Sequence, residues 1–320
     1  MKRRKKIPKK RKILDKKLIF STGIIAVIVL GLVCYKVLVQ NPEIKFSLRA
    51  AIIDQLGFGK TQNPEFNRTV TNLLIGAGFD VFYHKSESVT VNFYRGLAKY
   101  DYGIIILRVH SALRNQTPPV VDLFTSENYT DARAKELERE RWLGLVTKGN
   151  YSWAPDQFYF AITPLFIESL EDYFPKSIVI AMGCWSLKTE CEQLAAAFIK
   201  KGAKAYIGWT DEVYPQDTDN ETYYMLNKLL NDDKKLGDAI SETKVYPILG
   251  GTTRLDFYPE SAHDLTISEL IEEAKPSGTL QSAIDSRKPL LPLFCVVAVI
   301  INFTLDHCKS DTCAKRICLK

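Results

Sequence analysis

Cysteine is scarce in most of the chain. Residues 40–290 contain only Cys184 and Cys191, although the 320-residue sequence has seven cysteines in all. Two cysteines cannot build the dense disulfide framework of a small secreted domain, so that class of fold is excluded. The sequence also lacks a G-x-G-x-x-G or P-loop motif after its first expected strand. That absence argues against a flavodoxin-like receiver or a nucleotide-binding domain.

A net positive charge is missing from the part of the chain that we expect to fold. Residues 1–17 hold eleven Lys or Arg against the single acidic Asp15, a net charge of +10. The whole chain carries +6, which leaves −4 for residues 18–320. Basicity is therefore confined to the tail, and we expect no nucleic-acid partner for the folded part.

One long uncharged run directly follows the basic tail. Residues 18–35 carry no charge, and 18 residues at ~1.5 Å each make a helix of roughly 27 Å, close to the bilayer core. Residues 37–39 extend the run past Lys36, and no small-residue cleavage site follows it. We expect an uncleaved transmembrane helix at 18–39, with the basic tail in the cytoplasm and the remainder outside. The alternative is a buried core helix beside a nucleic-acid-binding tail.

Asparagine usage supports an exported domain independently. Half of the twelve asparagines begin an N-x-S/T sequence, whereas ordinary Ser and Thr frequencies would give about one or two such sites. The excess indicates a glycosylated surface on the outer side of a cell membrane. The glycosylation candidates are Asn67, Asn115, Asn128, Asn150, Asn220 and Asn302.

The C-terminal region allows two interpretations. Residues 290–305 are uncharged but only 16 long and contain Pro292, so they form either a second membrane span or a buried strand. A span would make Asn302 inaccessible and the protein two-pass instead of single-pass. In the basic tail 306–320, the cysteines near His307 suggest either a metal site or, as we expect, a solvated tail. We predict no metal and no cofactor.

Apolar runs alternate with helical patterns between a spacer at 40–47 and a linker at 259–289. This alternation predicts βαβ units, hence a three-layer α/β/α domain over 48–258 with a mainly parallel sheet. Residues 246–258 are less regular. Expected strands are 48–56, 79–83, 103–109, 120–124, 142–147, 178–183 and 203–209, and expected helices are 64–76, 91–100, 131–141, 164–173, 190–201, 221–230 and 236–243.

Two of these strands end on reactive side chains. The run 103–109 is followed by His110, and the run 178–183 is followed by Cys184. Parallel strands deliver such residues to the same rim of a sheet, where catalytic groups gather. A thiol needs a base to attack a carbonyl, and His110 is the obvious one. Backbone N–H groups of Cys184 and of the loop after His110 would stabilise the oxyanion.

This order of features resembles the caspase-like cysteine peptidases, a group that includes clostripain, gingipain, legumain and the CHAT domains. The segment 184–210, CWSLKTECEQLAAAFIKKGAKAYIGWT, is most similar to the gingipain and CHAT branch. The resemblance covers residues 48–245 and implies a caspase/hemoglobinase-like sheet with His110 as base and Cys184 as nucleophile. Ser111 stands where the family usually has Gly, and Gly183 where it often has Ala. The resemblance implies that oxyanion donors lie at Ser111, Gly183 and Cys184.

Four further residues are candidates for a substrate pocket. Trp185 and Trp209 either wall a cleft or pack in the core. Asp211 and Glu212 either recognise a basic side chain, as acidic residues do in gingipain-like enzymes, or begin a solvated loop.

The sequence therefore supports two hypotheses. The first is a membrane-anchored, outward-facing cysteine endopeptidase acting on a peptide or protein substrate. The second is a catalytically inactive module of the same fold that binds a peptide or glycan. Both have the lipid bilayer as a partner, and neither has a nucleic acid.

Overall fold

A mainly parallel sheet, sheet A, runs through the part of the chain that the structure, a computed structural model, describes, namely residues 45–275. Its strand order is β12-β9-β8-β3-β1-β2. Five strands are parallel and only the edge strand β12 is antiparallel. The predicted α/β class with a mainly parallel sheet is therefore confirmed. The strands are β1 (Arg49–Asp54), β2 (Asp80–Lys85), β3 (Ile104–Arg108), β8 (Ile178–Ala181), β9 (Ala205–Trp209) and β12 (Leu255–Tyr258).

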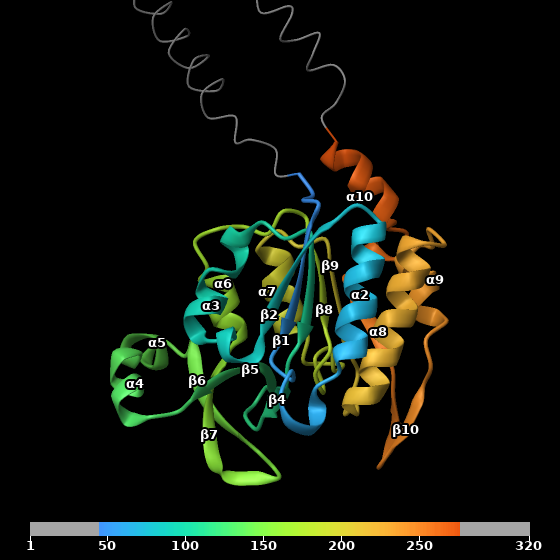
Figure 1. Cartoon of the computed structure of the whole chain (residues 1–320). Coiled ribbons are helices and arrows are strands. Elements are labelled where there is room, and N and C mark those ends of the chain that lie inside the picture. Colours follow the sequence, from blue (N-terminus) through green and yellow to red (C-terminus); the bar gives the residue numbers. More distant parts are fainter. Residues whose placement is uncertain (1–44, 276–320) are drawn as a thin grey trace, which may run out of the picture. The chain divides into compact units, whose positions relative to one another are not determined.

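Helices cover both faces of sheet A (Figure 1). Side chains alternate along each strand, so Ile52 and Ile106 pack on one face while Ile53 and Leu107 pack on the other. The first face is covered by α2 (Pro64–Gly76), α8 (Pro215–Leu230), α9 (Leu236–Ser241) and α10 (Ile267–Ala274). The second face is covered by α3 (Val91–Arg95), α6 (Pro164–Glu168) and α7 (Gln193–Lys200). Short 3-10 helices are Gly59–Thr61, Ser86–Ser88, Leu97–Tyr100 and Glu260–Ala262.

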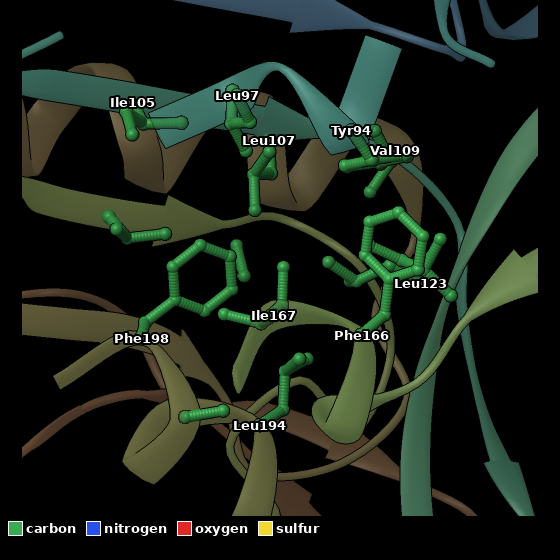
Figure 2. Packing of buried hydrophobic residues seen from close by; sticks show 14 of the residues in the cluster. Tyr94, Leu97, Ile105, Leu107, Val109, Leu123, Phe166, Ile167, Leu194 and Phe198 are labelled. Carbon is green, nitrogen blue, oxygen red and sulfur yellow. The ribbon is translucent and has the colours of Figure 1, made fainter. Parts of the chain in front are cut away.

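Burial on both faces explains why the central strands are continuous apolar runs. Every residue of β3, β8 and β9 is buried, whereas most of the edge strand β2 is exposed or half-buried. Figure 2 shows the second face, where Ile105 and Leu107 of β3 lie among Phe166, Ile167 and Phe198 from the covering helices. The core on this side fixes the strands whose ends carry the candidate site.

A second, antiparallel sheet is inserted between β3 and β8. Sheet B has the order β4-β5-β7-β6 and begins directly after His110. Figure 1 shows it beyond the C-terminal ends of the strands of sheet A. Its strands are β4 (Ser111–Arg114), β5 (Val120–Asn128), β6 (Val146–Tyr151) and β7 (Ala154–Ile162), and the insertion also holds α4 (Asp131–Glu136) and α5 (Glu138–Trp142). A small hairpin of β10 (Tyr246–Ile248) and β11 (Gly251–Thr253) precedes β12.

Several elements differ from the expectations. The charged helix predicted over 131–141 is two short helices that meet at Leu137, and the helix predicted over 91–100 stops at Gly96 and continues as a 3-10 turn. The strand predicted over 142–147 is wrong at its start, because Trp142 belongs to α5. β7 is absent from the prediction, since Pro155 and its polar neighbours hide the strand pattern.

The described chain begins and ends at the N-terminal edge of sheet A. Phe46 packs beside Gly103, just before β3, where an added Cβ would come within 2.9 Å of the Phe46 ring. At the other end α10, which lies inside the expected linker 259–289, packs onto the core through Ile267 and Leu270. Glu273 of α10 pairs with Lys176 just before β8, at 2.6 Å. Both ends thus lie opposite sheet B (Figure 1).

The expected membrane segments fall outside the described residues. This holds for the tail 1–17, the helix at 18–39, the segment 290–305 and the tail 306–320. Within residues 45–275, none of the helices combines the length and the apolar character needed to cross a bilayer.

Candidate functional site

His110 and Cys184 follow adjacent strands of sheet A. β3 and β8 are parallel, and their last paired residues are Leu107 and Ala181. The Met182 N–H still donates to the Leu107 carbonyl at 2.9 Å. Because His110 and Cys184 each follow the last paired residue by three positions, both residues reach the same level of the C-terminal rim.

The same rim contains the point where the strand order reverses. From β1 the chain runs to β2 on one side and then to β3 on the other. Ligands of open α/β sheets bind outside the carboxyl ends of the strands at such a point. Gln55, which follows β1, accepts a hydrogen bond from the His110 backbone N–H through Oε1 at 2.8 Å. This bond holds His110 at the opening between β1 and β3.

Ser111 and Gly183 join the two strand ends directly. The Ser111 hydroxyl donates to the Cys184 carbonyl at 2.6 Å. A Cβ added to Gly183 would lie 2.2 Å from Ser111 Oγ, 2.6 Å from the Val109 carbonyl oxygen and 2.8 Å from the Ser111 amide nitrogen. Glycine at 183 is therefore required by the close approach of the two chains, and the serine hydroxyl fills the space that an alanine methyl group would need.

The imidazole of His110 is half-buried against aromatic rings. Its centroid lies 4.6 Å from that of Tyr151 and 5.3 Å from that of Trp153, both in the β6–β7 hairpin. Burial, followed by the charge of nearby Arg108, lowers the pKa of His110 to about 4. The ring is thus neutral at neutral pH and able to accept a proton.

Cys184 follows β8, and its thiol is half-buried against the loop after β9. Its sulfur lies 3.5 Å from both the amide nitrogen and the carbonyl oxygen of Val213. Burial raises the pKa of the thiol, although the Val213 N–H opposes the shift, and the acidic Glu212 raises it further. Cys184 therefore rests as a thiol, and not as a thiolate.

The two residues are close through their backbones, but no interaction in the described structure links their side chains, because the His110 ring packs on Tyr151 and Trp153 while Cys184 Sγ lies against Val213. Within residues 45–275, neither ring nitrogen of His110 has a hydrogen-bond partner, and no hydrogen bond joins the ring to Sγ of Cys184. Catalytic hydrogen bonds are often long without substrate and tighten when it binds. Proton transfer from the thiol to the imidazole therefore requires a substrate-bound geometry in which Sγ and a ring nitrogen meet, and the lowered pKa makes His110 a weaker base than a free imidazole.

Trp185 occupies a strained turn immediately after the cysteine. Its φ of +55° lies in the left-handed region, which costs a non-glycine residue about 1–3 kcal/mol. Asp211 holds the turn, because its carbonyl accepts from the Trp185 N–H at 3.0 Å and its Oδ1 from the indole N–H at 2.7 Å. The other carboxylate oxygen pairs with Lys188 Nζ at 2.9 Å. Backbone strain of this kind clusters at functional sites.

The four residues expected in a substrate pocket lie in different environments. Trp209 is fully buried and its indole N–H donates to Thr218 at 2.8 Å, so it packs in the core and does not wall a cleft. Asp211 uses both carboxylate oxygens to hold the turn at Trp185. Glu212 is exposed and its carboxylate pairs with no cation of the described region. Trp185 is half-buried, packs against the core and is held by Asp211, so among the four Glu212 is the exposed side chain near Cys184.

The structure contains a buried ion network beneath the rim that the sequence did not lead us to expect. Arg108, fully buried, pairs with Asp54 at 2.7 Å and with Asp219 through two hydrogen bonds of 2.8 Å. The pairs join β1, β3 and α8. The signal that could have revealed it is a charged residue inside the apolar run 103–109, since buried arginines need partners.

The glycosylation candidates also divide. Four of them, Asn115, Asn128, Asn150 and Asn220, are exposed. Asn67 is half-buried in α2, and its Nδ2, the atom to which a glycan would attach, donates to Asp54 at 2.8 Å and to Tyr83 at 3.2 Å. Asn67 is therefore the least accessible of the described candidates, and the exposed Asn150 also uses its Nδ2, which donates to the Pro155 carbonyl at 2.9 Å. Asn302 lies outside the described residues.

Other titratable residues do not form a site of their own. Cys191 is buried in the core, His84 bonds to Tyr102 at 2.8 Å, and His263 is exposed beside Asp264. No group of three metal-binding side chains occurs between residues 45 and 275.

No family model matches this chain, and no curated protein matches its sequence.

Proposed function

We propose that the chain is a membrane-anchored, outward-facing cysteine endopeptidase of the caspase-like class. The observation that carries the proposal is the equal register of His110 and Cys184 at the C-terminal rim of two adjacent parallel strands. The parallel sheet with helices on both faces is compatible with the class. A tightly held Cys184 backbone, bonded by Ser111, supports it further.

The proposed reaction follows from the two protonation states. As Sγ of Cys184 bonds to the carbonyl carbon of the scissile amide, its proton passes to His110. Backbone N–H groups around Ser111 and Cys184 stabilise the oxyanion. The C–N bond then breaks, and the imidazolium returns the proton to the leaving amine. Water, deprotonated by His110, hydrolyses the thioester and regenerates the thiol.

One experiment tests the mechanism in the full-length chain in detergent. A peptidyl electrophile should label Cys184, and digestion of a peptide mixture should fall about 10³-fold or more in Cys184→Ala and in His110→Ala. Cys191→Ala is the matched control, because Cys191 is a free cysteine buried away from the rim. Unchanged proteolysis in Cys184→Ala would show that the mechanism is wrong.

A second candidate function has one observation in its favour. His110 and Cys184 share no hydrogen bond in the described structure, as expected of an inactive binding module of the same architecture. If the wild-type chain binds peptides or glycans but neither cleaves nor reacts with the electrophile, this function replaces the first.

The proposed location is tested on intact cells. With a cytoplasmic N-terminus and an outward-facing domain, externally added protease should degrade residues 45–275 and leave the basic tail protected. Removal of glycans should increase mobility on a gel, and replacing Asn115, Asn128, Asn150 and Asn220 by Gln should abolish that change. Protection of the domain from external protease would contradict the orientation.

A further inference from the structure

An exposed aromatic ring stands directly beside His110. Trp153 occupies the turn between β6 and β7, and 68% of its surface is exposed, whereas Tyr151 on which it stacks is buried. It stacks on Tyr151 with ring centroids 4.8 Å apart and an interplanar angle of 2°. Within the described region its ring–ring contacts are with Tyr151 and His110, and its 68% exposure leaves much of the indole open to solvent.

The stack is held in place by the same residue that holds His110. Gln55 accepts the His110 backbone N–H through Oε1, and its Nε2 donates to the Tyr151 hydroxyl at 2.8 Å. Asn150 Nδ2 donates to the Pro155 carbonyl at 2.9 Å and closes the turn that carries Trp153. The position of the open face relative to His110 is therefore fixed before any substrate arrives, which lowers the entropic cost of binding.

The proposed role of His110 predicts which part of a peptide substrate would lie beside Tyr151 and Trp153. During acyl transfer the histidine returns its proton to the leaving amine. The leaving amine belongs to the residue on the C-terminal side of the cleaved bond, so that residue lies next to His110. The acyl half lies next to Cys184, where the exposed acidic Glu212 is found. The two halves of a peptide thus meet different surfaces, one aromatic and one acidic.

We infer that the stacked pair Tyr151 and Trp153 is the subsite for the residue immediately C-terminal to the cleaved bond, and that it takes an aromatic or large apolar side chain. This inference rests on the proposed function. An open indole face binds flat or apolar groups through area burial and ring stacking, and its electron-rich face does not attract an anionic side chain.

The test uses binding as well as cleavage, so that failure of the subsite can be separated from failure of catalysis. The full-length Cys184→Ala chain is titrated with capped fluorescent peptides that differ only at that position, carrying Phe, Leu, Ser or Glu. We expect Phe and Leu peptides to bind at least tenfold more tightly than Ser or Glu peptides. Adding Trp153→Ala should remove that preference, and Trp153→Phe should restore part of it.

Trp142→Ala is the matched control, because Trp142 is 84% exposed on α5 and touches neither His110 nor Tyr151 among the described ring contacts. It should leave all four affinities within twofold. Equal effects of Trp153→Ala and Trp142→Ala, or no preference for Phe and Leu in the parent, would overturn the subsite. In the wild-type background, cleavage before Phe and Leu should fall in Trp153→Ala through a rise in KM. If binding is selective but no peptide is cleaved, Tyr151 and Trp153 form an apolar peptide-binding surface, whereas the catalytic proposal and the assignment of the pair to the residue after a cleaved bond both fail.

Discussion

Two groups of ionisable side chains lie at the same rim of sheet A. They differ in burial and in pairing. Beneath the rim, the single positive charge of the fully buried Arg108 is shared by the two carboxylates of Asp54 and Asp219. At its surface, His110 and Cys184 are half-buried, and no hydrogen bond joins their side chains in the described structure. Satisfied buried charges hold a fold together, whereas reactive groups left unpaired are available for chemistry. The comparison predicts that stability and activity can be damaged separately.

Removing Arg108 should have the largest effect on stability. Arg108→Met leaves two buried carboxylates without their cation, a change that costs about 3–5 kcal/mol. Cys184→Ala should change the free energy of unfolding by less than about 1 kcal/mol, because the thiol makes only two long contacts. Denaturant unfolding of both variants checks the separation. Equal losses in the two variants would remove the distinction between the network and the dyad.

Gly183→Ala should be the next most damaging change. The added methyl group would meet two backbone atoms and Ser111 Oγ closer than 3 Å, so we expect a loss of about 2–3 kcal/mol. Ser111→Gly removes one of these three contacts, and the double variant should therefore recover part of the loss. Additive losses in a thermal unfolding cycle would show that Ser111 and Gly183 are independent.

Acid should weaken the native state through His110. Its folded-state pKa of about 4 lies below the unfolded value of about 6.5, so the unfolded chain binds more protons between these two pH values. Stability contributed by the neutral ring is present above pH 6.5 and is lost as pH falls toward 4, on the order of 2 kcal/mol. His110→Gln should flatten that pH dependence. An unchanged slope would contradict the depressed pKa.

The same shift extends the proposed enzyme's range toward acid. If His110 acts as the base, kcat/KM should fall with a midpoint near pH 4 instead of pH 6.5. A midpoint near 6.5 would mean that the ring is solvated in the active state.

Lys188→Ala should have the smallest effect. The Lys188–Asp211 pair is about one-third exposed, and such pairs contribute less than about 1 kcal/mol. Trp185 keeps its hydrogen bonds to Asp211 in that variant, so the turn after Cys184 should persist. A larger loss would show that Lys188, and not Asp211 alone, holds the strained turn.

The sequence predicts sheet A far better than sheet B, for a physical reason. Strands buried on both faces are unbroken apolar runs, so 103–109 and 203–209 are visible without any structure. β7 carries polar residues and Pro155 because part of it is exposed, and only its pairing with β5 and β6 makes it a strand. Element type follows from local pattern where burial is complete, and from long-range pairing where it is not.

The candidate site divides in the same way. The sequence indicates His110 and Cys184 because each ends a buried run. It does not distinguish Trp185, which lies at the rim, from Trp209, which lies in the core, since both are tryptophans next to strand ends. Tyr151, Trp153 and Gln55 reach His110 only through tertiary contacts of residues 41 to 55 positions away along the chain. No sequence spacing marks such neighbours.

The insertion of sheet B between β3 and β8 has a consequence for access. Phe46 and α10 lie at the edge of sheet A from which β3 and β8 start, whereas His110 and Cys184 follow the opposite ends of these strands. Sheet B lies beyond those opposite ends (Figure 1). A molecule that reaches the His110 ring therefore meets the β6–β7 hairpin with Tyr151 and Trp153, so the inserted sheet screens what arrives.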